Sequence, residues 1–208
     1  MFEVLYSDKE IVVIIKPCGV LSEDGEGSAC ALIREALSVN DVYPIHRLDR
    51  DVSGVMVYAL TKNAAAKLSR AVTENALEKV YLAVVHGIPE HPSGVFTDLL
   101  FKDSKKNKSY VVKRERKGVR RAELSYEVLE SANDRSLVRV KLHTGRSHQI
   151  RVQFASRKMP LFGDRKYGAD DGEKQIALFS HCLVFPHPTG GIMTFSKDPD
   201  GEIWKSLN

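Results

Sequence analysis

Short apolar runs separated by turn residues are the feature that most limits how this chain can fold. The runs at residues 11–15, 55–60 and 79–86 are rich in β-branched side chains, which favour strands. Similar, more polar patterns predict further strands at 2–6, 95–101, 122–129, 137–142, 176–185 and 192–195. Apolar side chains at helical spacing occur only between these runs. The pattern predicts an α+β fold with a mixed, largely antiparallel sheet and flanking helices.

Capping residues mark where the helices should begin. Ser28 is a candidate N-cap for a helix through Leu37, and Thr61 or Asn63 for a helix through Ala76. A third helix is expected within residues 146–157, with Ser147 as its candidate cap, and a final helical turn after Pro199. No repeat or obvious linker interrupts the pattern, so we expect one domain over residues 1–208.

Positive charge is concentrated in one segment. Residues 102–121 hold ten Lys or Arg and only two acidic residues, whereas the whole chain has a net charge of only +4, so the remainder is net negative. A basic segment on a mildly acidic body favours contact with a polyanion at one place. A solubilising loop is the alternative interpretation.

The remaining composition indicates a soluble protein of a reducing compartment. No apolar run approaches the ~18 residues of a membrane helix, and the N-terminus lacks the basic region of a signal peptide. The three cysteines are widely spaced and odd in number, which argues against a disulfide framework. We therefore expect a cytoplasmic protein without a membrane partner, and a monomer as the simplest state.

Residues 44–54 place charges of both signs directly before a buried strand. His46, Arg47 and Arg50 alternate there with Asp49 and Asp51. Such a stretch is typical of a catalytic loop at the edge of a sheet, although a solvated turn with ion pairs would look similar.

A second charged stretch lies about a hundred residues further on. Arg146, His148 and Arg151 fall near the start of the third predicted helix and could form an anion site. An Asp beside one of these arginines would stay ionised and oriented, as a carboxylate nucleophile requires, although a structural ion pair is the competing interpretation and is common. No glycine-rich phosphate loop or serine nucleophile elbow is present, and the histidine spacing disfavours zinc, so no metal is expected. A glycosidase pair of Asp49 with Asp51 is disfavoured, because alternate residues of an extended loop point apart.

Several motifs, in order along the chain, resemble one known family. They are Lys16-Pro17-x-Gly19, His46-Arg47-Leu48-Asp49 with Ser53-Gly54, Lys79-x-Tyr81-x-Ala83, Thr144 to Val152, Pro160-Leu161-x-Gly163-Asp164-x-x-Tyr167-Gly168, and His187-Pro188-x-x-Gly190. Together they resemble the RluA family of RNA pseudouridine synthases, over nearly the whole chain. The resemblance implies the pseudouridine synthase fold, a catalytic domain standing alone, and isomerisation of uridine to pseudouridine in tRNA or rRNA without a cofactor.

The resemblance also implies roles for single residues. Asp49 would attack the target uridine, at the base or at the sugar, and Arg151 would pair with Asp49. Tyr81 would pack on the base, Leu178 would form an apolar wall, and Arg47 would fill the space left by the flipped nucleotide. The residues expected to contact RNA are Arg47, Arg146, His148, Leu178, Lys105, Lys106, Lys108, Arg114 and Arg116, the last five on a basic hairpin at about residues 102–121.

Three positions depart from the family pattern. Val52 stands where Thr is usual, and Gln153 and Phe179 stand where many relatives have His. None of them carries a predicted catalytic role, so we expect effects on loop packing or RNA fit. An RNA chaperone on the same fold and a nucleosidase remain the alternative functions.

Overall fold

The computed structural model describes residues 2–205, which fall into two compact units. Unit 1 comprises residues 2–79 and 179–199, and unit 2 comprises residues 80–178 and 200–205. The chain passes from unit 1 to unit 2 near the start of strand β5 (Glu78–His86) and returns at the start of β10 (Leu178–Pro186). That the units act as one catalytic domain stays a prediction.

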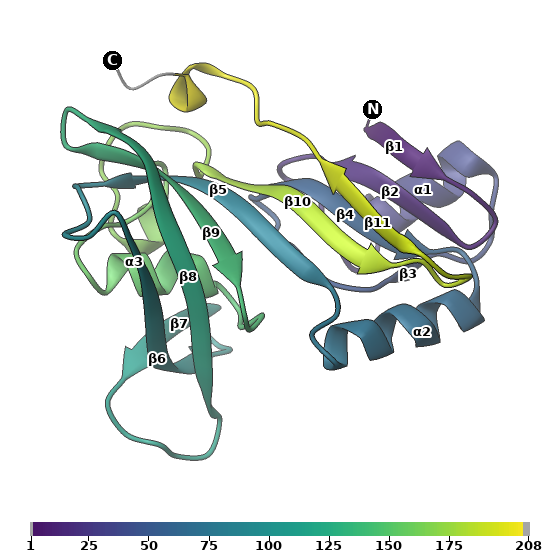
Figure 1. Cartoon of the computed structure of the whole chain (residues 1–208), viewed down its shortest axis with the longest axis horizontal. Coiled ribbons are helices and arrows are strands. Elements are labelled where there is room, and N and C mark those ends of the chain that lie inside the picture. Colours follow the sequence, from purple (N-terminus) through teal and green to yellow (C-terminus); the bar gives the residue numbers. More distant parts are fainter. Residues whose placement is uncertain (1, 206–208) are drawn as a thin grey trace. The chain divides into compact units, whose positions relative to one another are not determined.

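Unit 1 is a sheet with two helices. The strands β1 (Glu3–Ser7), β2 (Ile11–Lys16), β4 (Ser53–Ala59) and β10 are neighbours in that order. The short β3 (Tyr43–Pro44) pairs with β4, and β11 (Ile192–Ser196) pairs with β10. The β4–β10 pair is parallel, whereas the β1–β2, β2–β4, β3–β4 and β10–β11 pairs are antiparallel. Figure 1 labels these elements along the chain.

Both helices of unit 1 begin at predicted capping residues. The helices are α1 (Ala29–Leu37) and α2 (Lys62–Thr73). The Ser28 hydroxyl accepts from the Ala31 N–H, and the Thr61 hydroxyl accepts from the Ala64 N–H. Each bond satisfies a backbone donor that the first helical turn leaves free. Ala64 and Leu68 of α2 pack into the apolar core that β2, β4 and β10 also supply. The helix predictions for these two segments are confirmed.

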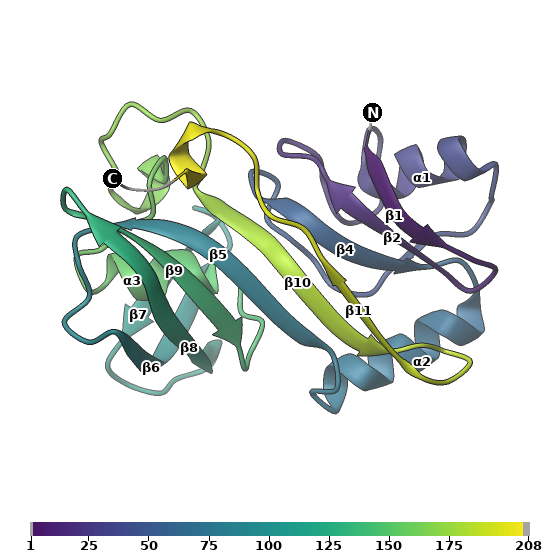
Figure 2. The same cartoon turned by 45° about the horizontal axis from the view of Figure 1, so that its top comes forward.

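Unit 2 contains five strands and one short helix. Its strands follow the order β5, β9 (Arg135–Leu142), β8 (Val119–Ala132), β6 (Ser93–Asp103) and β7 (Lys108–Val112). The pairs β6–β7, β6–β8 and β8–β9 are antiparallel. Helix α3 (Gln149–Ala155) contacts β6 and β7, and two 3₁₀ turns, η1 (Arg165–Tyr167) and η2 (Glu202–Trp204), complete the unit. Figure 2 shows α3 close to β7.

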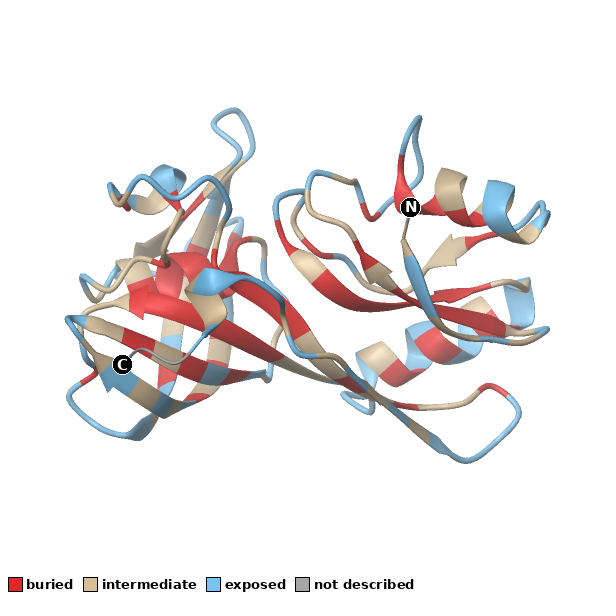
Figure 3. Ribbon diagram, turned by 90° about the horizontal axis from the view of Figure 1, so that it is seen from above, coloured by how far each residue is buried: buried red, intermediate tan, exposed pale blue. Residues whose placement is uncertain are grey.

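The buried positions explain which strands the sequence signals most strongly. Ile11 to Ile14 and Val55 to Ala59 are fully buried, and Ala83 to Val85 equally so. In Figure 3 the buried colour runs along the strands, whereas the connecting loops are exposed. Continuous apolar runs therefore correspond to interior strands, and the alternating segments β6 and β8 have one wetted face.

Two local predictions need correction. The basic hairpin expected at about residues 102–121 has other bounds: β6 pairs with β7, which lies inside the basic segment, and a connection leads from β7 into β8. Ser147 does not cap α3. The residue preceding α3 is His148, which has φ 54° and makes no side-chain capping bond. The Gln149 side chain instead accepts from the Arg146 N–H at 2.9 Å.

Candidate active site and RNA-binding surface

The loop at residues 44–54, which precedes β4, is fixed by backbone contacts within unit 1. The Ser22 hydroxyl donates to the Leu48 carbonyl at 2.9 Å and accepts from the Leu48 N–H at 3.0 Å. Ser22 is 3% exposed, so these bonds form away from water. The side chains of Leu48 and Val52 are buried on either side of Asp49. Asp49 is therefore held at a defined place on a half-buried loop.

The segment that follows β2 clamps the other side of the same loop. The Gly19 N–H donates to the Arg50 carbonyl, and the Arg50 Nε donates to the Gly19 carbonyl, both at 2.8 Å. The Lys16 ammonium donates to the carbonyls of Pro17, Val20 and Arg50 at 2.7–3.2 Å. The Lys16-Pro17-x-Gly19 motif thus holds the backbone on the C-terminal side of Asp49.

Lys16 is a buried cation. Its side chain is fully buried, and this burial lowers its pKa to about 8, an effect that the carboxylates of Asp51 and Asp49 partly oppose. The three carbonyl acceptors compensate the ammonium for the water that it loses. The cation therefore acts as a fixed structural tie beneath the loop.

His46 begins the charged part of the loop and is neutral. Its Nε2 accepts from the Val57 N–H at 3.3 Å, so the ring proton lies on Nδ1. Burial, with the nearby Lys79 ammonium, lowers the pKa of His46 to about 3. The Nδ1 atom is buried and has no hydrogen-bond partner among residues 2–205. This imidazole joins the loop to β4 and does not act as a cation.

Gly54 permits a close approach of two backbones in unit 1. Its φ is +127°, and an added Cβ would lie 2.4 Å from the Ser180 carbonyl oxygen. Ser180 lies opposite Gly54 in the parallel pairing of β4 with β10, and Phe179 lies opposite Ser53. The Ser53-Gly54 motif therefore sets how closely β10 packs beside the end of the loop.

Arg151 has a fixed carboxylate partner within unit 2. Its Nε donates to Asp164 Oδ2 at 2.6 Å and its Nη2 donates to Asp164 Oδ1 at 2.8 Å. Both side chains are almost completely buried, so this bidentate pair orients the guanidinium strongly. Asp164 was not predicted from the sequence as a partner of Arg151. Its place in the Gly163-Asp164-x-x-Tyr167 motif was the available signal.

Tyr167 lies beside the Arg151 guanidinium, whose Cζ is 5.2 Å from the ring centroid. The Tyr167 hydroxyl accepts from the Ser109 N–H of β7 at 2.8 Å and is 2.9 Å from His148 Nδ1. Burial raises the pKa of Tyr167, although the Ser109 N–H opposes this shift. This tyrosine therefore connects the basic strand β7 to the first residues of α3.

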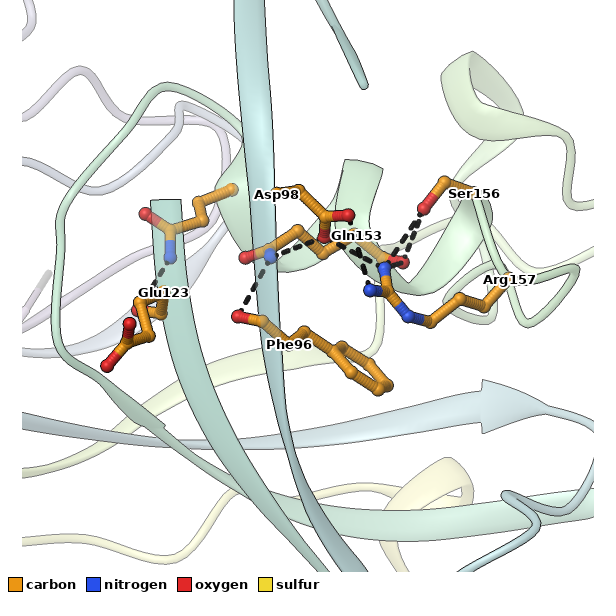
Figure 4. A network of polar contacts seen from close by, with 7 residues as sticks. Phe96, Asp98, Glu123, Gln153, Ser156 and Arg157 are labelled. Atoms are coloured by element: carbon orange, nitrogen blue, oxygen red, sulfur yellow. Dashed lines mark hydrogen bonds and ion pairs between the residues drawn. The ribbon is translucent and has the colours of Figure 1, made fainter. Parts of the chain in front are cut away.

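A second network fixes α3 to β6, as Figure 4 shows. The Gln153 amide nitrogen donates to the Phe96 carbonyl at 3.2 Å and to Asp98 Oδ2 at 2.7 Å. Arg157 donates to the same carboxylate at 2.9 Å, and its Cζ lies 3.9 Å from the Phe96 ring centroid. A neutral histidine nitrogen has one proton at most and could not make both bonds of the Gln153 amide nitrogen. Glutamine at this position thus supports the helix that carries Arg151.

The other predicted site residues occupy two kinds of position. Tyr81 on β5 and Leu178 at the start of β10 are each 5% exposed. Arg47 is exposed and forms an ion pair with Glu23 at 3.1 Å. Arg146 is exposed and donates to the Arg121 carbonyl, whereas His148 is 9% exposed and bonded to Tyr167. Asp49 and Arg47 belong to unit 1 and Arg151, Tyr81 and Leu178 to unit 2, and their meeting in one site stays a prediction.

The basic segment carries its charges into solvent. All of its Lys and Arg side chains are exposed except Lys108, which is half-buried. Within residues 2–205, Arg121 is the one member of this segment that forms an ion pair, with Glu123. The Arg116 guanidinium lies 4.7 Å from the Phe101 ring centroid. Most of these cations are thus available to a polyanion.

The described residues hold neither a metal cluster nor a membrane span. In residues 2–205, no three His, Cys, Asp or Glu side chains are grouped so that they could hold a metal ion. None of the helices within that range is long and apolar enough to cross a bilayer.

Comparison with known proteins identifies the class of protein that this fold and these motifs define. Residues 10–156 match the family described as RNA pseudouridylate synthase. The chain belongs to this family of RNA pseudouridine synthases, which are isomerases that convert uridine to pseudouridine in RNA. The predictions of the family, its isomerase activity and its fold are confirmed.

Individual relatives agree. The chain is 35% identical to the dual-specificity RNA pseudouridine synthase RluA of Escherichia coli (strain K12), over 95% of this chain and 93% of that protein. It is 32% identical to an uncharacterized RNA pseudouridine synthase of Aquifex aeolicus (strain VF5), over 98% of this chain and 71% of that protein. It is 31% identical to ribosomal large subunit pseudouridine synthase C of Buchnera aphidicola, of which it spans 66%. Human RNA Pseudouridylate Synthase Domain Containing 1 shares the fold, with a TM-score of 0.81 at 23% identity, over 96% of this chain and 84% of that one.

Proposed function

We propose that this protein isomerises selected uridines in structured RNA, either tRNA or rRNA, with Asp49 as the nucleophile. The observation that carries the proposal is the set of hydrogen bonds that fixes the backbone on both sides of Asp49. Ser22 bonds to Leu48 on one side, and Lys16 and Gly19 bond to the Arg50 carbonyl on the other. A nucleophile gains from such preorganisation, because no backbone ordering remains to be done during the reaction. The motif that contains Asp49 lies within the region matched to the family.

The reaction rearranges one nucleotide. The Asp49 carboxylate attacks the uridine, at the base or at C1′ of the ribose, and the bond between N1 and C1′ breaks. The uracil turns, C5 bonds to C1′, and the bond to Asp49 breaks so that the free carboxylate is regenerated. The proton then leaves C5, and N1 gains a proton. No electrons are gained or lost, so the balance requires neither an oxidant nor a reductant. The uridine must first leave its stack, which costs a few kcal/mol.

Arg151 and Tyr81 are proposed to act beside Asp49. A guanidinium has five N–H donors, and Asp164 uses two of those of Arg151, so the same group can bind a second carboxylate. Pairing with Arg151 would keep Asp49 ionised and aimed. The Tyr81 ring is proposed to stack on the flipped base, and Leu178 to form an apolar wall of the base pocket. Arg47 is proposed to fill the space that the flipped nucleotide leaves in the RNA.

Substitution of the nucleophile tests this proposal. Asp49→Asn should abolish tritium release from transcripts labelled at C5 of uracil while RNA binding is retained. Asp51→Asn, which removes the exposed carboxylate two residues further along the same loop, is the matched control and should stay active. Equal turnover by the Asp49 variant would contradict the assignment. Free uracil or a change of RNA mass would indicate hydrolysis instead of isomerisation.

The basic segment is proposed to bind the RNA backbone. Replacing its cations by Ala should weaken binding and reduce the slope of log K against log salt by ~0.7 for each phosphate of single-stranded RNA that the variant no longer neutralises. The residues to replace are Lys105, Lys106, Lys108, Arg114 and Arg116. An unchanged slope would assign the segment to solubility alone. A cytoplasmic location and a monomeric state stay predictions.

A further inference from the structure

A small hollow lies along strand β7 where α3 packs beside it, entirely within unit 2. Its volume is about 250 Å³, and it is open to solvent. Its lining includes Lys108, Tyr110 and Val111 from β7, Val152 and Ser156 at α3, and Tyr167 from η1. The proposed chemistry uses none of these residues, and Lys108 alone is among the cations proposed to bind the RNA backbone.

The hollow combines aromatic rings with one cation. The Lys108 ammonium lies 5.0 Å from the centroid of the Tyr167 ring and 5.9 Å from that of Tyr110. Val152 belongs to the apolar cluster of unit 2, against which Val111 and Tyr167 pack. Aromatic and apolar walls with one positive group fit a planar base that carries a phosphate.

The surroundings narrow the ligand class. Lys108 is the half-buried member of a segment whose other cations are exposed, so the hollow is the recessed part of a positive surface. A volume of 250 Å³ lies below that of most drug-sized ligand sites, which suits one nucleotide rather than a paired helix. Proteins commonly read unpaired RNA by stacking splayed bases on aromatic side chains.

The hollow is also connected to the predicted catalytic arginine. Tyr167 forms part of its wall, and the ring of this residue lies beside Arg151. Its hydroxyl accepts from the Ser109 N–H and lies within hydrogen-bond distance of His148. A ligand against the Tyr167 ring would therefore rest on the residue that joins β7 to α3.

From these observations we propose that the hollow is an accessory nucleotide site, which binds one unpaired, non-target nucleotide of the substrate RNA. The base stacks on the tyrosine rings, and the Lys108 ammonium moves from the rings to the phosphate. The inference rests on the proposed function for its choice of RNA as the ligand. It adds a site for a second nucleotide besides the uridine that reacts.

Binding of a fluorescein-labelled ten-nucleotide oligouridylate to the full chain tests the site. Tyr110→Ala should raise Kd about tenfold without changing the salt slope, because stacking involves no counterion release. Tyr110→Phe should stay within about twofold of the wild type, because the ring remains. Lys108→Gln should raise Kd and reduce the slope by ~0.7. Wild-type affinity in Tyr110→Ala would overturn the proposal.

Cross-linking locates the bound base independently of affinity. An oligouridylate that contains 4-thiouridine should cross-link to peptides with Tyr110 or Tyr167, and cross-links confined to other peptides would overturn the site. Tritium release separates the two proposals. If the wild type releases tritium and Tyr110→Ala binds the oligouridylate normally, only the accessory site is refuted. Weakened binding by Tyr110→Ala in a chain that releases no tritium supports the site and refutes the proposed function.

Discussion

The buried pair of Arg151 and Asp164 allows a prediction that separates stability from chemistry. Asp164→Asn removes the negative partner of a guanidinium that is 4% exposed. Breaking a buried ion pair on one side costs about 3–5 kcal/mol, because the desolvated guanidinium loses the carboxylate that binds it through two hydrogen bonds. For a chain of this size each kcal/mol lowers Tm by about 2–4 °C, so we expect a decrease of about 6–20 °C.

The double variant Arg151→Met with Asp164→Leu provides the second half of the test. Replacing both partners of a buried pair by apolar side chains is often neutral or stabilising, so most of the lost stability should return. Activity should not return, because the proposed partner of Asp49 is then missing. Thermal and urea unfolding, followed by circular dichroism, measure the stability. Tritium release measures the activity.

Asp170→Asn is the matched control for this experiment, because Asp170 is exposed and lies in the same region of the chain. It should change the free energy of unfolding by less than about 0.5 kcal/mol. A cost below about 1 kcal/mol for Asp164→Asn would refute the reasoning that the pair is a tightly desolvated unit. Full activity in the double variant would show that Arg151 is structural only.

Three further predictions concern the loop and its supports. Because Lys16 has a pKa of about 8, the folded chain releases a proton between pH 8 and 10.5 that the unfolded chain keeps. The free energy of unfolding of the wild type, relative to that of Lys16→Met, should therefore rise with pH across that window. Urea titrations should show a rise of at most about 1.4 kcal/mol per pH unit. The ring resonances of His46 should not shift between pH 4.5 and 8 in NMR spectra. The contribution of His46 to the free energy of unfolding should decline as the pH falls from 6.5 towards 3. A titration midpoint of these resonances near pH 6.5 would contradict the burial of the ring. Gly54→Ala should prevent the β4–β10 pairing and yield little folded protein. Gly172→Ala is the control and should lose less stability, because its added Cβ meets no atom within 4 Å. Equal yields of folded protein would refute the close approach at Gly54.

Most of the regular structure could be predicted because local chemistry determines it. Ser28 and Thr61 cap their helices by bonds that span three residues, and interior strands such as β2 consist of continuous apolar residues. Strand β7 was missed because its buried Ser109 is polar and its apolar run is short and lies within a strongly charged segment. The Ser147 cap was wrong because His148 takes a left-handed conformation that local composition did not reveal.

The long-range contacts of the site could be predicted only in part. The motifs identified Asp49 and Arg151 as candidate site residues, but the bonds that fix them come from Ser22, Lys16 and Asp164. Those bonds depend on how separate segments pack, and the sequence does not distinguish a serine or lysine that makes such bonds from one that does not. The resemblance to a family located the motifs but did not indicate which backbone or side-chain groups they bind.

The supports of the loop bind main-chain atoms rather than variable side chains. Ser22 bonds to the Leu48 backbone, Lys16 bonds to carbonyls, and the Arg50 side chain bonds to the Gly19 carbonyl, whereas the exposed Arg47 pairs with Glu23. Mutation can therefore alter Arg47 and leave the reacting group in register. This separation would let duplicated copies of such a gene diverge in substrate choice while their common chemistry is inherited unchanged.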